Sequence, residues 1–296
     1  MKKVKNSKLI LLLIAMIIAV PFASEAQKKK KSSLLWEISG NGIKPSYLMG
    51  TFHMLPNEDF LLKDKVKDAF ASSEQIVLEL DMDDPSMMTK MQQQMMIADG
   101  KTLKDFMTEE EAEFLDQKLS EKYGAGLAAM GKLKPLAIAS MITVKMMGEQ
   151  PASFEFTFIS MAKQQKKEIL GLETVADQMQ VFEDIPYESQ LDDIIEMLQD
   201  EEVTARYFDR MIATYKAEDI NGLMDVMAEN FDDPEETAVL LDNRNIKWIP
   251  QIGELATEKS TFFAVGAGHL PGKKGVIQLL KDAGYKVKPV KDTKGS

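Results

Sequence analysis

Short apolar stretches with strand-like spacing mark the beginning of the folded part of the chain. Residues 34–39 and 47–49 are apolar runs separated by the glycine-rich residues 40–42, and this pattern predicts a β-hairpin. Residues 60–72 carry apolar side chains at helical spacing, and residues 75–81 follow with the pattern of a strand. The first part of the chain is therefore predicted to form a hairpin, a helix and a strand.

The order of strand, helix and strand returns near the end of the chain. Residues 262–265 have the pattern of a strand, residues 275–283 that of a helix capped by Gly284, and residues 285–290 that of another strand. Strand, helix and strand make a βαβ unit, whose two strands run parallel. We therefore expect an α/β fold with a mixed central β-sheet, built from two βαβ-like halves.

The segment between the two halves is largely helical in pattern. A short strand from residue 168 interrupts it, reaches Gly171 and Glu173, and gives way to a helix that begins near Thr174. This makes a third junction between a strand and a helix. Helices are predicted over residues 85–98, 108–121, 134–147, 154–165, 187–199, 201–216, 219–229, 235–241 and 246–257.

Residues 1–26 have the composition of a targeting segment. A lysine-rich start precedes an uncharged apolar run over residues 9–20, which is short for a membrane-spanning helix. Small residues before the end predict cleavage after Ala26, and an uncleaved anchor is the alternative. We expect an exported protein, periplasmic or extracellular, with a basic linker over residues 27–33 and a single domain over residues 34–296. The linker leaves association with an anionic membrane surface open.

Composition narrows the classes of function. The 296 residues carry a net charge of −11, which argues against nucleic acid as the main partner, and 45% of them are hydrophobic, enough for a sizeable core. Cysteine is absent. Disulfides and a cysteine nucleophile are therefore excluded, and a metal site would have to use histidine and carboxylate ligands.

The two histidines of the chain occupy the same local pattern. His53 and His269 each close a Gly-x-x-His motif, at residues 50–53 and 266–269, with an apolar strand before it and a Leu-Pro step shortly after it. Glycine lets the backbone turn and lets a ligand approach closely. Because ligands of α/β proteins gather where strands end and helices begin, we expect the fold to bring both motifs to one site.

Two imidazoles and nearby carboxylates form a ligand set for a divalent ion such as Mn, Co, Fe or Zn. The candidate metal ligands are His53, His269, Glu79 and Glu173, because both glutamates belong to predicted strand ends. A metal ion with an open position acidifies water, and the glutamate that does not bind the ion would act as general base. Glu173 at the start of a helix also fits a simple interaction with the helix dipole.

Glu37 and Arg244 are further candidate catalytic residues. Glu37 interrupts an apolar strand, so it either belongs to the site or faces water on an edge strand. Arg244 has the chemistry to hold a substrate carboxylate or an oxyanion, and its alternative is an ion pair at the surface. Other chemistries fit poorly, because the chain has no His-Glu-x-x-His helix, no Gly-x-Ser-x-Gly elbow and no phosphate-binding loop.

Six short motifs span nearly the whole domain in order: Leu35-Trp36-Glu37-Ile38, Gly50-Thr51-Phe52-His53, the strand with Glu79, Gly171-Leu172-Glu173-Thr174, Asp242-Asn243-Arg244-Asn245 and Gly266-Ala267-Gly268-His269-Leu270. With these motifs the chain resembles the TraB/PrgY/GumN family, which includes the Tiki metalloproteases. The resemblance implies a single α/β domain with a mixed central sheet and a metal-dependent hydrolase-like site. It also implies that both histidines act there, assisted by Glu79, Glu173 and Arg244, with Glu37 carried over as well.

The sequence thus predicts an exported metal-dependent peptidase that acts on a peptide or protein. A protein that binds a secreted peptide in the same cleft without cutting it is the second hypothesis, since some members of the family bind or shut down peptide signals. In a third, the histidines are structural and bonded to backbone carbonyls. The substrate, the metal and the oligomeric state are left open.

Overall fold

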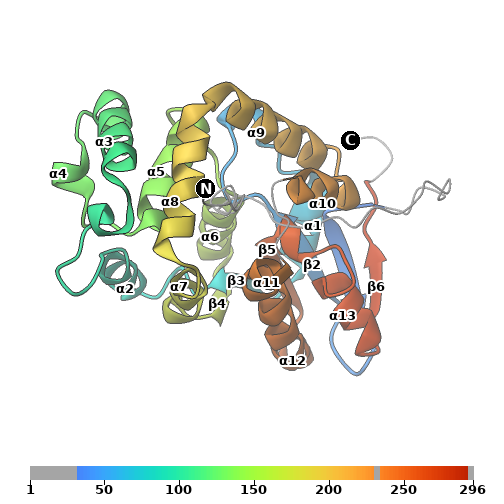
Figure 1. Cartoon of the computed structure of the whole chain (residues 1–296). Coiled ribbons are helices and arrows are strands. Elements are labelled where there is room, and N and C mark those ends of the chain that lie inside the picture. Colours follow the sequence, from blue (N-terminus) through green and yellow to red (C-terminus); the bar gives the residue numbers. More distant parts are fainter. Residues whose placement is uncertain (1–31, 230–233, 293–296) are drawn as a thin grey trace.

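The computed structural model describes residues 32–229 and 234–292, and its centre is a six-stranded mixed sheet. The strands lie in the order β4-β3-β5-β2-β1-β6 (Figure 1). Strands β4, β3, β5 and β2 run parallel, whereas β1 is antiparallel to both of its neighbours. The strands are β1 (Leu35–Ser39), β2 (Ser46–Thr51), β3 (Gln75–Leu80), β4 (Glu168–Glu173), β5 (Thr261–Gly266) and β6 (Lys286–Pro289).

The two predicted βαβ-like halves are present, and they interleave. The first is β2, α1 (Asp64–Ser72) and β3, and the second is β5, α13 (Val276–Asp282) and β6. Strand β5 of the second half lies between β3 and β2 of the first. The mixed α/β fold is therefore confirmed, and the interleaving, which the local pattern did not predict, puts the ends of β2 and β5 side by side.

The middle segment is largely helical, as predicted. Figure 1 shows its helices α2 to α5, α7 and α8 gathered on the β4 side of the sheet, away from β6. The helices of the middle segment are α2 (Met87–Gln94), α3 (Glu109–Tyr123), α4 (Leu127–Met130), α5 (Pro135–Met146), α6 (Phe154–Gln165), α7 (Val175–Glu183), α8 (Tyr187–Gln199), α9 (Glu201–Lys216) and α10 (Ile220–Ala228). One connected cluster of buried apolar side chains runs from Leu34 to Val287 and joins helices and sheet.

The start of one helix differs from the prediction, and this changes the position of the candidate residue Arg244. The sequence pattern placed residues 242–245 between two helices. The structure instead has a nearly continuous helical run, in which α11 (Pro234–Thr237) passes through a π-helical turn at Ala238–Asp242 into α12 (Asn243–Glu258). Arg244 consequently lies in the first turn of a long helix. Such π turns often accompany functional sites, because they re-aim the side chains around them.

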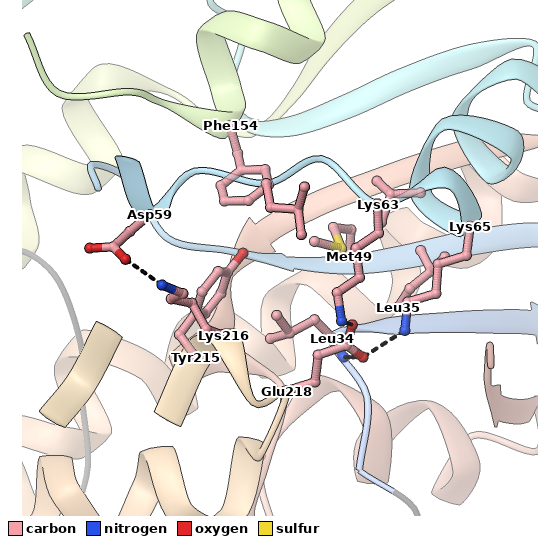
Figure 2. Close-up of a pocket in the computed structure, with 12 residues that line it drawn as sticks. Leu34, Leu35, Met49, Asp59, Lys63, Lys65, Phe154, Tyr215, Lys216 and Glu218 are labelled. Carbon is pink, nitrogen blue, oxygen red and sulfur yellow. Dashed lines mark hydrogen bonds and ion pairs between the residues drawn. The ribbon is translucent and has the colours of Figure 1, made fainter. Parts of the chain in front are cut away.

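The start of the described chain is fastened to the domain. Ser32 Oγ donates to the carbonyl of Glu218 at 2.5 Å, and Ser33 Oγ donates to its carboxylate at 3.1 Å. The same carboxylate pairs with Lys65 at 2.6 Å and with Lys63 at 2.7 Å (Figure 2). The last two residues of the predicted linker are thus part of the fold. The predicted targeting segment, residues 1–26, lies outside the described residues.

Within residues 32–229 and 234–292, none of the helices combines the length and the apolar character that crossing a bilayer demands.

Candidate functional site

The candidate residues meet at the carboxyl ends of four neighbouring parallel strands. His53 lies two residues beyond β2, and His269 ends the 3-10 turn that follows β5. Glu79 is the penultimate residue of β3, and Glu173 is the last residue of β4. Because parallel strands end at the same edge of a sheet, these four side chains start from one row of positions.

The glycine of each Gly-x-x-His motif faces the other motif. A Cβ atom on Gly50 would lie 2.6 Å from Leu270 Cδ1 and 3.1 Å from Ala267 Cα, so this glycine lets the second motif pack against the first. A Cβ atom on Gly266 would lie 3.4 Å from Glu79 Oε1, 3.5 Å from His53 Nε2 and 3.6 Å from His269 Cδ2. Three chemically reactive side chains therefore converge on the open face of Gly266.

Arg244 joins the two glutamates. Its Nε donates to Glu173 Oε1 at 3.0 Å, and its Nη2 donates to Glu173 Oε2 at 2.8 Å and to Glu79 Oε2 at 2.6 Å. Its Nη1 donates to the carbonyl of Leu240 at 3.1 Å and contacts His269 Nε2 at 3.2 Å. With all its donor nitrogens engaged, Arg244 is a buried counterion for two carboxylates, neither a surface ion pair nor a free anion-binding group.

Glu79 is held as a carboxylate. It is buried, and burial by itself would raise its pKa, but Arg244 and the neighbouring histidines hold that pKa far below its usual range. The backbone N–H of Gly266 also donates to Glu79 Oε1 at 2.7 Å, and Gln178 donates to Glu79 Oε2 at 3.1 Å. A carboxylate that stays ionised in this way is suited to bind a cation and poorly suited to accept a proton.

His269 is buried and its tautomer is fixed by a neighbouring amide. Asn245 Nδ2 donates to the carbonyl of Lys274 at 3.0 Å, so Asn245 Oδ1 is the acceptor for His269 Nδ1 at 2.6 Å. Nε2 therefore carries the lone pair. Burial and the guanidinium of Arg244 lower the pKa of His269 to about 3. The ring packs on Trp248 with a centroid separation of 4.4 Å. His269 is thus a neutral imidazole, which is the form that binds metals.

His53 has the opposite environment. Its Nδ1 bonds Glu155 Oε1 at 2.9 Å, and its side chain is 41% exposed. Burial lowers the pKa of His53, but the Glu155 carboxylate outweighs it and raises that pKa to about 9. Thr51 donates to the same oxygen at 2.7 Å, and Ser153 donates to the other at 2.9 Å. The free Nε2 of His53 is turned toward Gly266.

Glu155 was missed by the sequence analysis. It lies in the first turn of α6, where an acid is explained by the helix dipole alone. The only local signal is that this glutamate stands between Phe154 and Phe156 in an apolar stretch. Ser153, Asn245 and Gln178 give no stronger local signal, because polar residues at helix starts are common.

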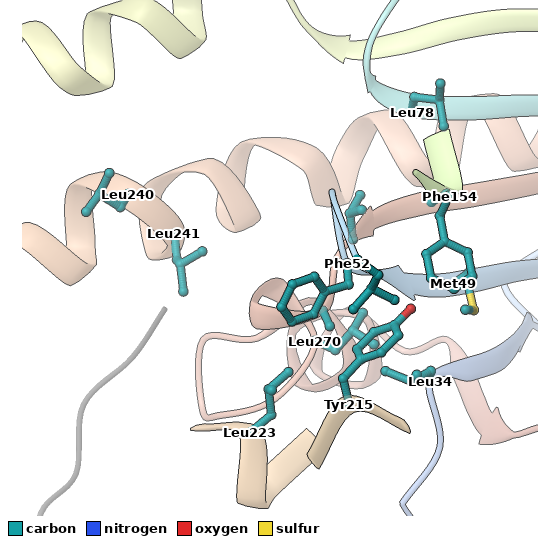
Figure 3. Packing of buried hydrophobic residues seen from close by; sticks show 14 of the residues in the cluster. Leu34, Met49, Phe52, Leu78, Phe154, Tyr215, Leu223, Leu240, Leu241 and Leu270 are labelled. Carbon is teal, nitrogen blue, oxygen red and sulfur yellow. The ribbon is translucent and has the colours of Figure 1, made fainter. Parts of the chain in front are cut away.

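An aromatic wall supports the His53 side of the site. Phe52 packs edge-on against Tyr215 at 5.3 Å, and Tyr215 packs against Phe154 at 5.8 Å (Figure 3). The hydroxyl of Tyr215 donates to the carbonyl of Gly50 at 3.0 Å. Because Phe52 and Phe154 directly precede His53 and Glu155 in the chain, this buried packing positions the histidine and its carboxylate partner.

Glu37 is not brought to this cluster. In strand register it lies opposite Tyr47 and Lys288, whereas His53 follows the far end of β2. With a rise of about 3.3 Å per residue, the four steps from Tyr47 to Thr51 span roughly 13 Å. The predicted role of Glu37 therefore has no support from its position.

The donor set has the chemistry of a divalent metal site without its tight spacing. Two imidazoles and one carboxylate are the ligands of many catalytic zinc sites. Among the described residues, however, no group of three or more such side chains qualifies as a metal site. Glu79 Oε1 lies 3.8 Å from His269 Nε2, and Arg244 contacts that nitrogen. The donors fit in type and direction, and binding would require Arg244 to release His269 and His53 to lose the proton on its Nε2.

The fold and the site define a class: an α/β protein with a histidine, carboxylate and guanidinium cluster at the carboxyl ends of parallel strands. The model of the TraB/PrgY/gumN family matches residues 34–289. The chain therefore belongs to the TraB/PrgY/gumN family. Neither the curated proteins nor the solved structures contain a match.

Proposed function

We propose that this protein is an exported metal-dependent hydrolase that cleaves peptides. The observation that carries the proposal is the convergence of His53 Nε2, Glu79 Oε1 and His269 on the open face of Gly266. The targeting character of residues 1–26 supports export, and the family supports a hydrolase-like site. His53, His269 and Glu79 are the residues that would hold the ion, whether Mn, Co, Fe or Zn.

When bound, such an ion acidifies water and polarises a carbonyl group. The protein supplies the orientation of the ligands. Glu155 accepts the Nδ1 proton of His53, and Asn245 accepts that of His269, so each ring presents Nε2. Histidine ligands commonly donate their second N–H to a carboxylate or carbonyl in this way, which fixes the ring and raises its basicity. The pairs with Glu155 and Asn245 are therefore positioning contacts.

Glu173 and Arg244 receive roles that differ from the sequence prediction. Both oxygens of Glu173 accept from Arg244, so we assign Glu173 to anchoring the guanidinium rather than to binding the ion. Glu79 has a strongly depressed pKa and makes a poor general base, which leaves it as the carboxylate ligand. Once it releases His269, the Nη1 of Arg244 becomes a donor for a developing oxyanion.

Metal binding of the purified protein tests the proposal directly. We expect Mn, Co or Zn to bind with a stoichiometry of one and to raise the melting temperature, measured by calorimetric titration and thermal unfolding. His53→Ala and His269→Ala should each weaken binding by about 100-fold or more. Glu37→Gln is the matched control, because it changes a strand glutamate outside the cluster. Absence of tight binding by the wild-type protein would overturn the metal proposal.

A second function, capture of a peptide without cleavage, is favoured by the contact between Arg244 and His269 Nε2. In that arrangement the cluster is a charged binding surface and needs no ion. Incubation of a peptide library with the protein and each metal separates the two functions. Fragments that depend on the metal and on His53 support the hydrolase, whereas intact peptide retained on the protein supports capture. If neither metal nor peptide binds, the histidines are structural.

A further inference from the structure

Strand β4 is an open edge of the sheet. It is the first strand in the sheet order, with β3 as its only neighbour in the sheet. Three of its residues are partly buried and one is exposed, whereas β3 and β5 are buried except at one end. Among the described residues, no backbone hydrogen bond joins the outer edge of β4 to another element. An edge of this kind presents unpaired N–H and C=O groups.

The opposite edge of the sheet is protected. Strand β6 has four residues, Lys286 to Pro289, with two lysines and a terminal proline. Short length, lysine and proline are the features by which natural proteins prevent another strand from pairing. Strand β4 has six residues, with neither lysine nor proline. The chain thus blocks one edge and leaves the other able to pair.

A groove runs along β4 toward the histidine cluster. One cavity of about 680 Å³ is lined by β4 from Leu170 to Glu173, by Leu80 and Asp81 at the end of β3, and by residues of α2, α7 and α12. A second cavity of about 510 Å³ is lined by Arg244 and Trp248 of α12. The two cavities share four lining residues, among them Glu173 and Gln251, so they form one continuous groove. Figure 1 shows β4 lying between α7 and α12.

The groove carries an excess of negative charge. Its lining has the cations Lys90, Lys247 and Arg244, and the carboxylates Asp81, Asp84, Glu173, Asp177 and Asp184. Lys90 is paired with Asp84 at 3.0 Å, and Arg244 with Glu173 at 2.8 Å. The lining therefore retains three aspartates, Asp81, Asp177 and Asp184, against one remaining cation, Lys247. A segment with positive charge complements this lining.

We propose that the groove binds an extended, positively charged peptide segment, which pairs as an added strand with the outer edge of β4. Backbone hydrogen bonds to the edge would supply affinity, and alternate side chains would reach the aspartates. At its inner end the segment would meet Arg244, which lines the second cavity. The inference deepens the proposed function, on which it rests for the fate of the peptide, by naming the class of substrate.

The experiment measures binding of three fluorescent ten-residue peptides, with cleavage monitored separately. The first alternates lysine and valine, the second alternates glutamate and valine, and the third is the first with every second backbone nitrogen methylated. Methylation removes the backbone donors of one edge and leaves charge and side chains unchanged. We expect the glutamate peptide and the methylated peptide each to bind at least about tenfold more weakly than the lysine peptide.

Two readouts locate the peptide on the protein. Amide hydrogen exchange of residues 168–173 should slow when the lysine peptide binds, while that of β6 stays unchanged. The double variant Asp81→Asn with Asp184→Asn should weaken binding by about fivefold or more. The double variant Asp225→Asn with Asp282→Asn makes the same change of net charge outside the groove lining and should bind as the wild type does.

The proposal is overturned if the methylated peptide binds as tightly as its parent or if exchange in β4 does not respond. It is also overturned if β4 becomes protected with rising protein concentration in the absence of peptide, because a second copy then covers the edge. Peptide binding by the His53→Ala variant distinguishes this inference from the proposed function. If His53→Ala still binds the lysine peptide but no longer cleaves it or binds metal, both proposals are supported. If the wild-type protein binds the peptide but neither cleaves it nor binds metal, only the hydrolase proposal is overturned.

Discussion

The two Gly-x-x-His motifs share one local pattern and place their histidines in opposite environments. His53 is 41% exposed and bonded to a carboxylate, and its pKa is raised to about 9. His269 is 6% exposed, bonded to an amide and next to a guanidinium, and its pKa is lowered to about 3. One ring is therefore cationic and the other neutral at the same pH. The motif determines where a histidine lies, and its tertiary partners determine its charge.

Because of this difference, the two motifs contribute differently to the site. Titratable groups whose environments push their pKa values apart mark a site that can hold both a charged and a neutral partner. The two motif glycines also differ in their surroundings. Gly50 packs against the second motif, whereas Gly266 faces the reactive side chains. Variants of the cluster and titration of its histidines can test this difference between the motifs.

Removal of the guanidinium next to His269 should have the largest effect. Arg244→Met leaves Glu79 and Glu173 buried without a counterion, which should cost about 3–5 kcal/mol of unfolding free energy. Urea unfolding at pH 7 measures the loss. The control is Arg210→Met, because Arg210 pairs with Glu229 while both side chains are about half exposed, and it should cost less than about 1 kcal/mol. Equal losses for the two variants would show that the cluster adds nothing to stability.

Alanine at the two motif glycines should separate folding from function. Gly50→Ala forces its Cβ against Leu270 Cδ1 at 2.6 Å and should destabilise the fold by about 1–3 kcal/mol. Gly266→Ala places its Cβ no closer than 3.4 Å to any neighbour and should change stability by less than about 0.5 kcal/mol, yet abolish metal binding by filling the space between the histidines. Thermal unfolding and metal titration of both variants check this. Tight metal binding by Gly266→Ala would place the ion elsewhere.

A direct titration of the two rings should show their opposite protonation. Because the chain has two histidines, their NMR signals are assigned by comparing the wild type with His53→Gln. We expect one ring to titrate near pH 9 and the other to stay neutral above about pH 3. Glu155→Gln should move the pKa of His53 down toward its ordinary value of 6.5 and leave that of His269 unchanged. If the pKa of His53 were unchanged in Glu155→Gln, the Glu155 carboxylate would not be the cause of its raised value.

Stability should depend on pH in opposite directions at the two histidines. Between pH 6.5 and about 9 the folded state binds more protons at His53 than the unfolded state does, so this contribution is lost as the pH rises. At His269 the unfolded state binds more protons between about pH 3 and 6.5, so stability is lost as the pH falls. Denaturation of His53→Gln across this range should flatten the alkaline side alone, and His269→Gln should reduce the acid slope. The same flattening in both variants would contradict the comparison.

The secondary-structure elements and the positions of the histidines at strand ends were predictable from the local pattern of residues. Hydrophobic spacing predicted all six strands, because periodicity depends only on neighbours a few residues away. The strand-to-helix junctions placed His53, His269 and Glu173 at strand ends for the same reason. Arg244 was recognised as a candidate, but its helix was not, since the π turn of residues 238–242 joins two helical patterns that look separate.

The way these residues act together depends on contacts between distant parts of the chain. The interleaved strand order brings the two motifs into contact, and no local pattern encodes which strand enters between two others. His53 meets Glu155 across 102 residues, and Arg244 meets Glu79 across 165. The pKa of a histidine depends on charge and burial in space rather than along the chain. The sequence could therefore predict a site with two histidines, and the fold alone made one of them cationic and the other neutral.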